Sequence, residues 1–328
     1  MRTRRVLLAL VIIVAGVLAS GRAAMAQAQR FTTPWGDPDL QGIWNNQTPV
    51  PFERPTELAG KAFFTREEAA EFERTHVKRL VDVIAVADPT SVREHGRPDA
   101  ADEQNLAIWM DESKVSPTRR TSLIIDPPDG RIPHTPEGRA RWASVPSFER
   151  DLFGQPNAAN GPQDRPLIER CLAAGGLFEP NPFYNNYHSI LQTPGHVVIV
   201  MEELHEHRII PLDGRPHVGP NIRQWLGDSR GRWEGQTLVV ETTNFNDRML
   251  FHGATSKLRL VERFTRLDAN TIMYRLTVTD PATFTGPWTV ENALRRSDAM
   301  IYESDCHEGN RGLANILSAA RAEEKKKD

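Results

Sequence analysis

Several features are absent from the 328-residue sequence, and each absence limits what the protein can be. It has no glycine-rich phosphate-binding loop, no dinucleotide fingerprint and no Gly-x-Ser-x-Gly turn, so nucleotide and serine-nucleophile chemistry lack their usual motifs. It also has no marked excess of one charge, because the formal net charge is −3. This balance gives no electrostatic reason to expect nucleic acid as a partner.

Long apolar runs are absent after the first 26 residues. No later stretch reaches the roughly 20 apolar residues that cross a bilayer, so we expect no stable membrane insertion of the mature chain. Residues 1–26 combine early arginines, an apolar run at 6–17 and small residues before Ala26, which is typical of a secretory signal peptide. The protein is therefore expected in the periplasm or secreted, and Arg4-Arg5 leaves twin-arginine export open as a second route.

Cysteine is scarce, since only Cys171 and Cys306 are present. In an exported protein, such a pair predicts a disulfide that closes a long loop and stabilises the fold by about 4 kcal/mol. Two unpaired buried thiols are the alternative. A cysteine nucleophile is less favoured because no evident base lies near Cys171 in the sequence.

What the sequence does contain is a β-rich second half. Residues 183–307 show short strand-like runs joined by turn residues without intervening helices, which predicts an antiparallel meander forming a calycin-like barrel, with a β-sandwich as alternative. The central stretch 225–245 predicts a hairpin with its turn at 227–231. The expected strands are 187–192, 196–202, 208–211, 222–226, 236–245, 257–266, 271–280, 288–291 and 299–303.

The remaining mature sequence reads as helices and hairpins packed on this barrel. Residues 27–182 include a capping box at Thr65 that starts a helix running to about residue 86, and further short helices begin at Pro136 and Leu167. Residues 308–328 predict a C-terminal helix at 313–324 and a charged tail. No linker separates these parts into independent domains.

Glu262 is the most unusual polar residue of the β half. Alternation along 258–264 places it on the face that also carries Leu260 and Phe264. It is either a general acid or base on an apolar wall, or half of a buried ion pair with an arginine such as Arg232 or Arg275. The same alternation turns Tyr274 inward.

A short acidic and histidine-rich stretch is the one candidate metal site. Alternation would place His205 and His207 on one side, where both imidazoles and Glu203 could bind Zn²⁺ or another divalent ion. A solvent-exposed cluster at a strand end is the competing interpretation. No cofactor is certain from the sequence.

Other candidates for chemistry lie near strand ends. His307 follows Cys306 and could transfer protons at a barrel mouth, and Glu241 is a third candidate acid or base. Alternatively, His307 belongs to a capped turn that leads into the last helix. Aromatic and amide side chains that could contact a sugar or phenolic ring are Asn185, Tyr187, His188, Trp233, Asn244 and Tyr274.

The sequence resembles a family of exported bacterial proteins with no assigned activity, and the resemblance extends over nearly the whole mature chain. The segments that carry it are GIWNNQTP, SLIIDPPDGRIP, YNNYHSILQTPG, RIIPLDGRPH, WLGDSRGRWEGQTLVVETTNF, LVERFTR and CHEGN. Gly42-Ile43-Trp44 also resembles the Gly-x-Trp that opens the first strand of lipocalins and related calycins. This second resemblance implies a barrel, whereas neither resemblance implies a reaction.

Two functions are consistent with these features. The first is an exported hydrolase or lyase that acts on a carbohydrate or plant-derived aromatic compound by carboxylate and histidine acid–base chemistry. The second is a noncatalytic barrel that binds a small molecule. An open cleft where His307 faces Glu262 or Glu241 would favour catalysis, and a paired interior carboxylate without an exposed base would favour binding.

Overall fold

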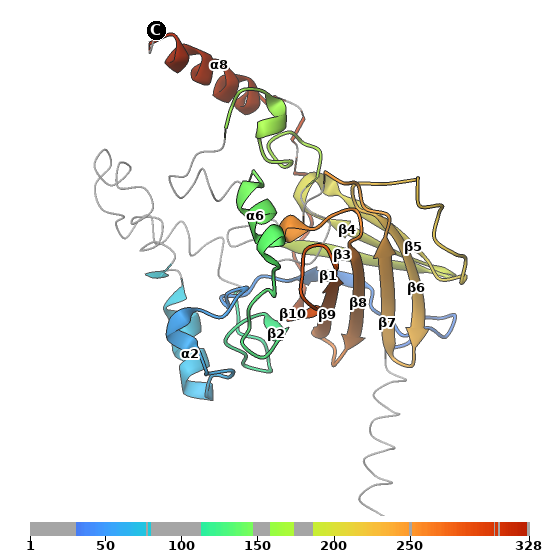
Figure 1. Ribbon diagram of the computed structural model, residues 1–328. Coiled ribbons are helices and arrows are strands. Elements are labelled where there is room, and N and C mark those ends of the chain that lie inside the picture. Colours follow the sequence, from blue (N-terminus) through green and yellow to red (C-terminus); the bar gives the residue numbers. More distant parts are fainter. Residues whose placement is uncertain are drawn as a thin grey trace, which may run out of the picture.

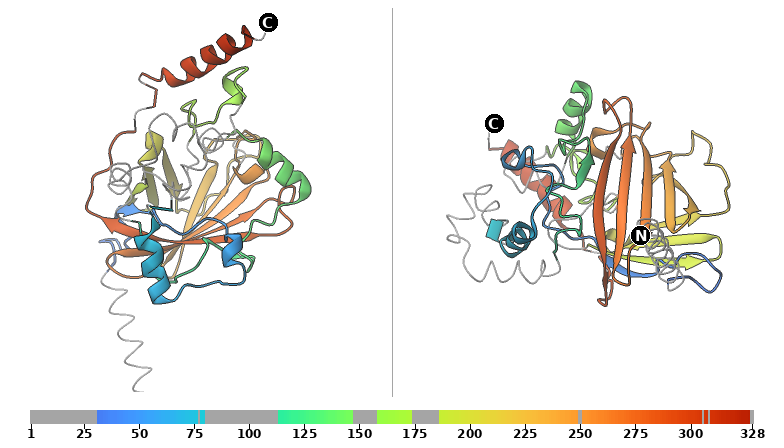
Figure 2. Two further views of the ribbon diagram at one scale, coloured as in Figure 1. Left: turned by 90° about the vertical axis from the view of Figure 1, so that its left-hand side faces the viewer. Right: turned by 90° about the horizontal axis from the view of Figure 1, so that it is seen from below.

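The computed structural model describes residues 31–76, 78–79, 113–146, 158–173, 186–248, 251–304, 306–307 and 309–326. The expected signal peptide and Asn185 lie outside these ranges. A single curved antiparallel sheet dominates the molecule, and its yellow and orange strands face each other across the interior (Figures 1 and 2). A search of the described residues for a helix long and apolar enough to span a membrane finds none.

The sheet has ten strands, and nine of them follow one another in the order β5-β4-β3-β1-β10-β9-β8-β7-β6, with β2 paired to β10 off this path. Most neighbours in this order are also neighbours in sequence, which confirms the predicted antiparallel meander. The strands are β1 (Gly42–Asn45), β2 (Ile124–Asp126), β3 (Tyr187–Thr193), β4 (His196–Met201), β5 (His207–Pro211), β6 (Asp228–Glu234), β7 (Thr237–Thr243), β8 (Arg259–Arg266), β9 (Thr271–Thr279) and β10 (Trp288–Ser297).

The sheet is not closed by hydrogen bonds. Strands β5 and β6 are its two edges, and the ladders among the described strands do not join them. They meet through side chains instead: a Cβ added to Gly231 would lie 2.8 Å from Ile210 and 2.6 Å from Leu212. A side chain at this point of β6 would displace Ile210 of β5 and the adjacent Leu212, so glycine allows the close approach of the two edges. The result is a barrel with a packed seam.

The N-terminal part contributes a strand to the barrel. Strand β1 lies between β3 and β10, so the sheet extends beyond the predicted range of 183–307. Trp44 of β1 is fully buried and its indole donates to Leu40 O at 2.9 Å. The Arg266 guanidinium lies 5.4 Å from the Trp44 ring and donates to Asp39 O at 2.7 Å. These contacts fix the position of the Gly-x-Trp segment.

Three strand predictions need correction. The central hairpin turns at Gly235, with φ +61°, rather than at 227–231, because Asp228 to Glu234 pair completely with β7. Residues 222–226 form only one isolated bridge, Gln224 to Phe245, and 299–303 are not a strand. Strand β10 instead continues to Ser297, held by β9 and β1 on its two sides.

The helices agree better with the sequence. The predicted capping box of Thr65 and Glu68 starts α2 (Arg66–Arg74), which ends with Thr75 as its C-cap and is shorter than the predicted helix to about residue 86. Thr135 caps α6 (Pro136–Ser144). Helix α8 (Gly312–Glu324) extends away from the sheet (Figure 1). The described part of the helix expected at 167–174 is a turn. Short 3-10 segments are η1 (Thr56–Leu58), η2 (Pro162–Asp164), η3 (Glu203–His205) and η4 (Phe251–Gly253).

One end of the barrel is covered by aromatic residues and α6. We call it the α6 end; β10 begins there, and the β6–β7 and β8–β9 turns lie at the opposite end. His252 of η4 lies 5.0 Å from Phe52, 4.9 Å from Trp142 and 5.5 Å from Trp288, measured between ring centroids. Arg141 of α6 donates to Gly253 O at 3.0 Å, which ties this cover together.

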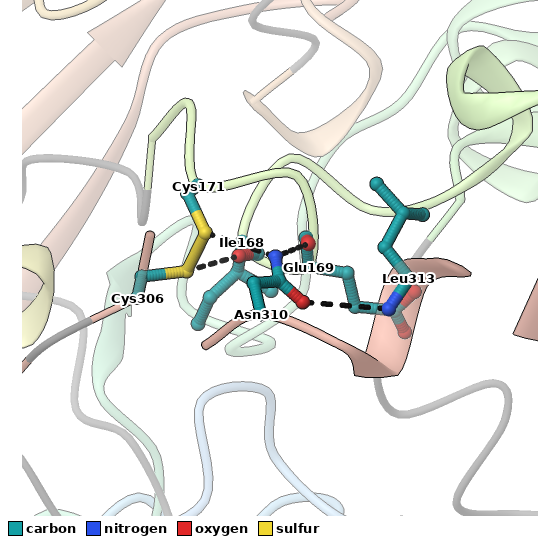
Figure 3. Close-up of a disulfide and its surroundings, with 6 residues drawn as sticks. All are labelled: Ile168, Glu169, Cys171, Cys306, Asn310 and Leu313. Atoms are coloured by element: carbon teal, nitrogen blue, oxygen red, sulfur yellow. Dashed lines mark hydrogen bonds between the residues drawn. A yellow bond between two sulfur atoms is a disulfide. The ribbon is translucent and has the colours of Figure 1, made fainter. Parts of the chain in front are cut away.

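The predicted disulfide is present. Cys171 and Cys306 are bonded at 2.04 Å across a sequence separation of 135 (Figure 3). The Asn310 amide donates to Glu169 O at 3.0 Å beside the bond and accepts from Leu313 N at 3.4 Å. The disulfide therefore links the segment before α8 to residues 158–173.

Candidate functional site

The inner wall of the barrel carries polar side chains from most of its strands. The register of the ladders and the alternation of buried residues show which side chains point inward. Strand β3 and each of strands β5 to β10 contribute a polar residue to the inner wall, and so does the residue that follows β1. All of them are almost fully buried. We call this set the polar belt: Arg208, Ser229, Thr242, Glu262, Tyr274, Asn292, Asn46 and His188.

A buried ion pair forms the centre of the belt. Glu262 is 0% exposed, and its two oxygens accept from both terminal nitrogens of Arg208, with Nη1 to Oε1 at 2.9 Å. The Tyr274 hydroxyl donates to Oε1 at 3.1 Å. Burial, the largest influence, lowers the pKa of Arg208, but Glu262 together with Tyr274 and Glu206 raises it above the usual value. The pair is therefore charged and internally neutral.

The arginine of this pair crosses the seam of the barrel. Arg208 projects from β5, and its Nη2 lies 3.1 Å from both Ser229 Oγ on β6 and Thr242 Oγ1 on β7. The two hydroxyls are 3.0 Å apart. These contacts connect the edge strands where the ladder is missing. The sequence had suggested Arg232 or Arg275 as the partner of Glu262, but these bind Glu234 and Glu291 instead.

On the opposite side of the belt, some buried polar atoms lack hydrogen-bond partners among the described residues. Asn46 N donates to Asn186 O at 3.1 Å, so it extends the β1–β3 ladder by one residue and lies on the same face as Trp44. Asn292 Nδ2 donates to Asn46 O at 2.7 Å. Both side-chain amide atoms of Asn46 are buried without a partner among the described residues.

His188 lies on the inner face of β3, two residues from Asn186, whose carbonyl accepts from Asn46 N. It is paired in register with Trp44 and Met201. Complete burial lowers its pKa to about 3, so the imidazole is neutral at pH 7. A neutral imidazole and carboxamides thus occupy this side of the belt.

Two indole groups on the inner wall also have N–H donors without a hydrogen-bond partner among the described residues. Trp233 on β6 and Trp288 on β10 both have buried Nε1 atoms without a hydrogen-bond partner in the described structure. Trp233 had been predicted as a substrate contact. Because buried indoles normally find an acceptor, these N–H groups are available donors on the inner wall.

The other predicted catalytic residues lie elsewhere. Glu241 faces outward from β7 and pairs with Arg259 at 2.6 Å. His307 is exposed beside the disulfide. The structure thus does not bring Glu241 or His307 to Glu262, which is enclosed in the belt.

A cluster around Glu241 contains His217, which the sequence did not single out. His217 Nδ1 lies 2.8 Å from Asp228 Oδ2, and its Nε2 lies 3.6 Å from Glu241 Oε1. Asp228 also pairs with Arg230 at 2.7 Å. His217 comes from the loop between β5 and β6, so only the fold brings these groups together.

Two predicted substrate contacts have other positions. Asn244 has φ +59°, and its amide donates to the carbonyls of Val218, Gly219 and Ile222 at 3.0 to 3.1 Å. It therefore holds the β5–β6 loop. Tyr187 is half-buried on the outward face of β3, next to His188.

The predicted metal ligands do not form the expected arrangement. Glu203 to His205 belong to a 3-10 turn with Leu204 at φ +52°, so strand alternation does not align His205 with His207. His207 is exposed at the start of β5. Within the described ranges, no group of three His, Cys, Asp or Glu side chains is placed to hold a metal ion.

Fold and site together define a β-barrel with a packed seam and a polar belt in its interior. A mutant of the fluorescent protein UnaG is similar over 34% of this chain and 72% of its own, at 14% identity and a TM-score of 0.23. The SAHS protein from Ramazzottius varieornatus is similar over 40% and 86%, at 12% identity and a TM-score of 0.25. Both TM-scores are too low to carry an argument about ligands or activity. No family model and no curated protein sequence matches the chain.

Proposed function

We propose that the protein is an exported, noncatalytic barrel that binds a small neutral molecule in its interior. The observation that carries this proposal is the set of buried polar atoms without partners on the inner wall, in Asn46, Trp233 and Trp288. Leaving a buried polar group unpaired costs about 1 to 3 kcal/mol. A bound molecule that pairs with one or more of these groups would recover part of that cost.

The arrangement of Glu262 also supports binding over catalysis. A general acid or base must come within hydrogen-bond reach of the substrate. Both oxygens of Glu262 are occupied by Arg208 and Tyr274, and the carboxylate is 0% exposed. Because the Arg208–Glu262 pair is neutral overall, it offers no uncompensated charge to an ion. A neutral ligand is therefore favoured.

The test is saturable binding of a neutral fluorescent probe, N-phenyl-1-naphthylamine, to the purified mature protein, with native mass spectrometry to detect a co-purified molecule. Met201 faces inward opposite His188, whereas Val200 on the same strand faces outward. We expect Met201→Trp to weaken probe binding at least about tenfold by filling the interior and Val200→Trp to leave it unchanged. Absence of both probe binding and a co-purified molecule would refute the proposal.

A second candidate function, acid–base catalysis as a hydrolase or lyase on a carbohydrate or plant-derived aromatic compound, is favoured by one observation. The Asp228 carboxylate orients the half-buried His217, whose other nitrogen faces Glu241. An oriented imidazole is a common general base. Turnover of glycosides, esters and phenolics across pH should then fall in His217→Asn and Glu241→Gln, with Glu262→Gln and His307→Ala alongside. Turnover unaffected by His217→Asn and Glu241→Gln would reject this site.

A further inference from the structure

The side chain of Asn46 combines three properties that structural asparagines rarely share. It is 1% exposed, neither its Oδ1 nor its Nδ2 has a partner in the described residues, and its backbone is fixed at both the N–H and the carbonyl. The backbone bonds hold the residue in the β1–β3 ladder on the face of Trp44. The amide therefore projects toward the interior with one acceptor and one donor group unused.

The neighbouring Asn45 provides a contrast. It is 3% exposed and belongs to β1, but its Oδ1 accepts from Gln47 N at 2.7 Å. Asn45 thus has a local structural role of the kind expected for a buried asparagine. Asn46 has no such bond, although it is the more deeply buried of the two.

The chemistry around Asn46 restricts what could pair with it. The donor and acceptor of a carboxamide lie side by side and match a second group that presents C=O and N–H on the same edge, as in a lactam, an imide or a primary amide. The nearest belt residues are His188, which is neutral at pH 7, and Asn292, whose Nδ2 is committed to Asn46 O. No charge in this half of the belt favours an ionised ligand.

We propose that Asn46 is the recognition residue of the interior site and binds the cis-amide edge of a neutral lactam or carboxamide through two hydrogen bonds. This inference rests on the proposed binding function and adds the ligand class. The apolar part of the ligand lies against the aliphatic and aromatic inner wall. Asn292 positions Asn46 through its bond to the backbone carbonyl.

A matched pair of ligands tests the inference. The planar lactam 2-quinolone presents C=O and N–H on one edge, and N-methyl-2-quinolone has the same ring system without the donor. Their affinities are measured by displacement of N-phenyl-1-naphthylamine. We expect wild-type protein to bind 2-quinolone at least about tenfold more tightly than the N-methyl compound.

Two matched variants separate recognition from folding. Asn46→Leu should abolish the preference for 2-quinolone, keep probe binding and raise the Tm of the ligand-free protein, because it removes an unpaired buried amide at similar volume. Asn45→Leu should lower the Tm and keep the preference. A preference that persists in Asn46→Leu, or is absent in wild type that binds the probe, would overturn the role of Asn46 while leaving the binding function intact. If the Tm falls in Asn46→Leu as it does in Asn45→Leu, the role of Asn46 in recognition is likewise overturned. Absence of probe binding by wild type would overturn both.

Discussion

Replacing Glu262 with glutamine would remove one charge of the Arg208–Glu262 pair and keep the size of the side chain. Arg208 is 4% exposed and Glu262 is 0% exposed, so solvent cannot compensate for the missing carboxylate. Loss of one partner from a buried pair costs about 3 to 5 kcal/mol, because the other charge stays buried. We expect Glu262→Gln to lower the free energy of unfolding by this amount.

Removing both charges should have a different result. Arg208→Met with Glu262→Leu eliminates the buried charges, while Ser229 and Thr242 keep the contact between their hydroxyls at 3.0 Å. Tyr274→Phe is added because the tyrosine hydroxyl donates to Glu262. Apolar replacement of a whole buried pair is neutral or stabilising by up to about 4 kcal/mol. The triple variant should therefore be at least as stable as the wild type.

The assay is urea denaturation of the mature, oxidised protein at pH 7, followed by tryptophan fluorescence and circular dichroism. Glu241→Gln is the control, since Glu241 lies outside the barrel with the 54% exposed Arg259 and its loss should cost under about 1 kcal/mol. If Glu262→Gln costs no more than this control, leaving the buried charge of Arg208 unpaired does not carry the cost argued here. A triple variant less stable than Glu262→Gln would also refute the reasoning.

Three further predictions concern other parts of the fold. Burial lowers the pKa of His188 from 6.5 to about 3. Between about pH 3 and pH 6.5, His188 therefore binds a proton in the unfolded chain but not in the folded chain. The contribution of His188 to the free energy of unfolding should be complete above pH 6.5 and fall by about 2 kcal/mol at pH 5. Denaturation curves at the two pH values should show this loss in the wild type but not in His188→Phe. Equal pH dependence in both proteins would contradict this. Cys306→Ser opens a loop across a sequence separation of 135 and should lower the free energy of unfolding by at most about 5 kcal/mol, as measured by denaturant titration; no loss would show that the disulfide acts only locally. Arg266→Ala removes the contact with Trp44 and three hydrogen bonds to the carbonyls of Asp39, Asp268 and Ala269. It should lower the free energy of unfolding by about 3 kcal/mol in the same titration. The control is Arg263→Ala, on the outward face, which should lower it much less.

The strands and caps were predictable because each depends on local pattern. Alternation in β8 and β9 placed Glu262 and Tyr274 inward correctly, since apolar and polar residues clearly separate there. The capping box at Thr65 required only four consecutive residues. The central hairpin was harder, because glycines occur at both Gly227 and Gly235 and both have positive φ.

The partner of Glu262 could not be found in the same way. In β5 the two isoleucines are adjacent, so the apolar pattern does not decide which face is inward. The structure buries Ile210 completely and leaves Ile209 59% exposed, which turns Arg208 inward with Ile210. Packing of β5 against Gly231 across the seam determines this choice, and a contact between strands that form no ladder leaves no trace in local periodicity.

The same seam explains why polar groups on one side of the belt have hydrogen-bond partners while Asn46 on the other side lacks them. Strands β5 and β6 lack a ladder, so side chains must connect them, and Arg208 does this while binding Glu262. Arg208, Glu262, Ser229 and Thr242 on that side are therefore committed to one another and hold the barrel together. At β1 the ladders continue on both sides, and no side chain is needed to join the strands. A buried carboxamide such as Asn46 is therefore not needed for closure there, and a bound molecule of the class proposed above would offset its cost to stability.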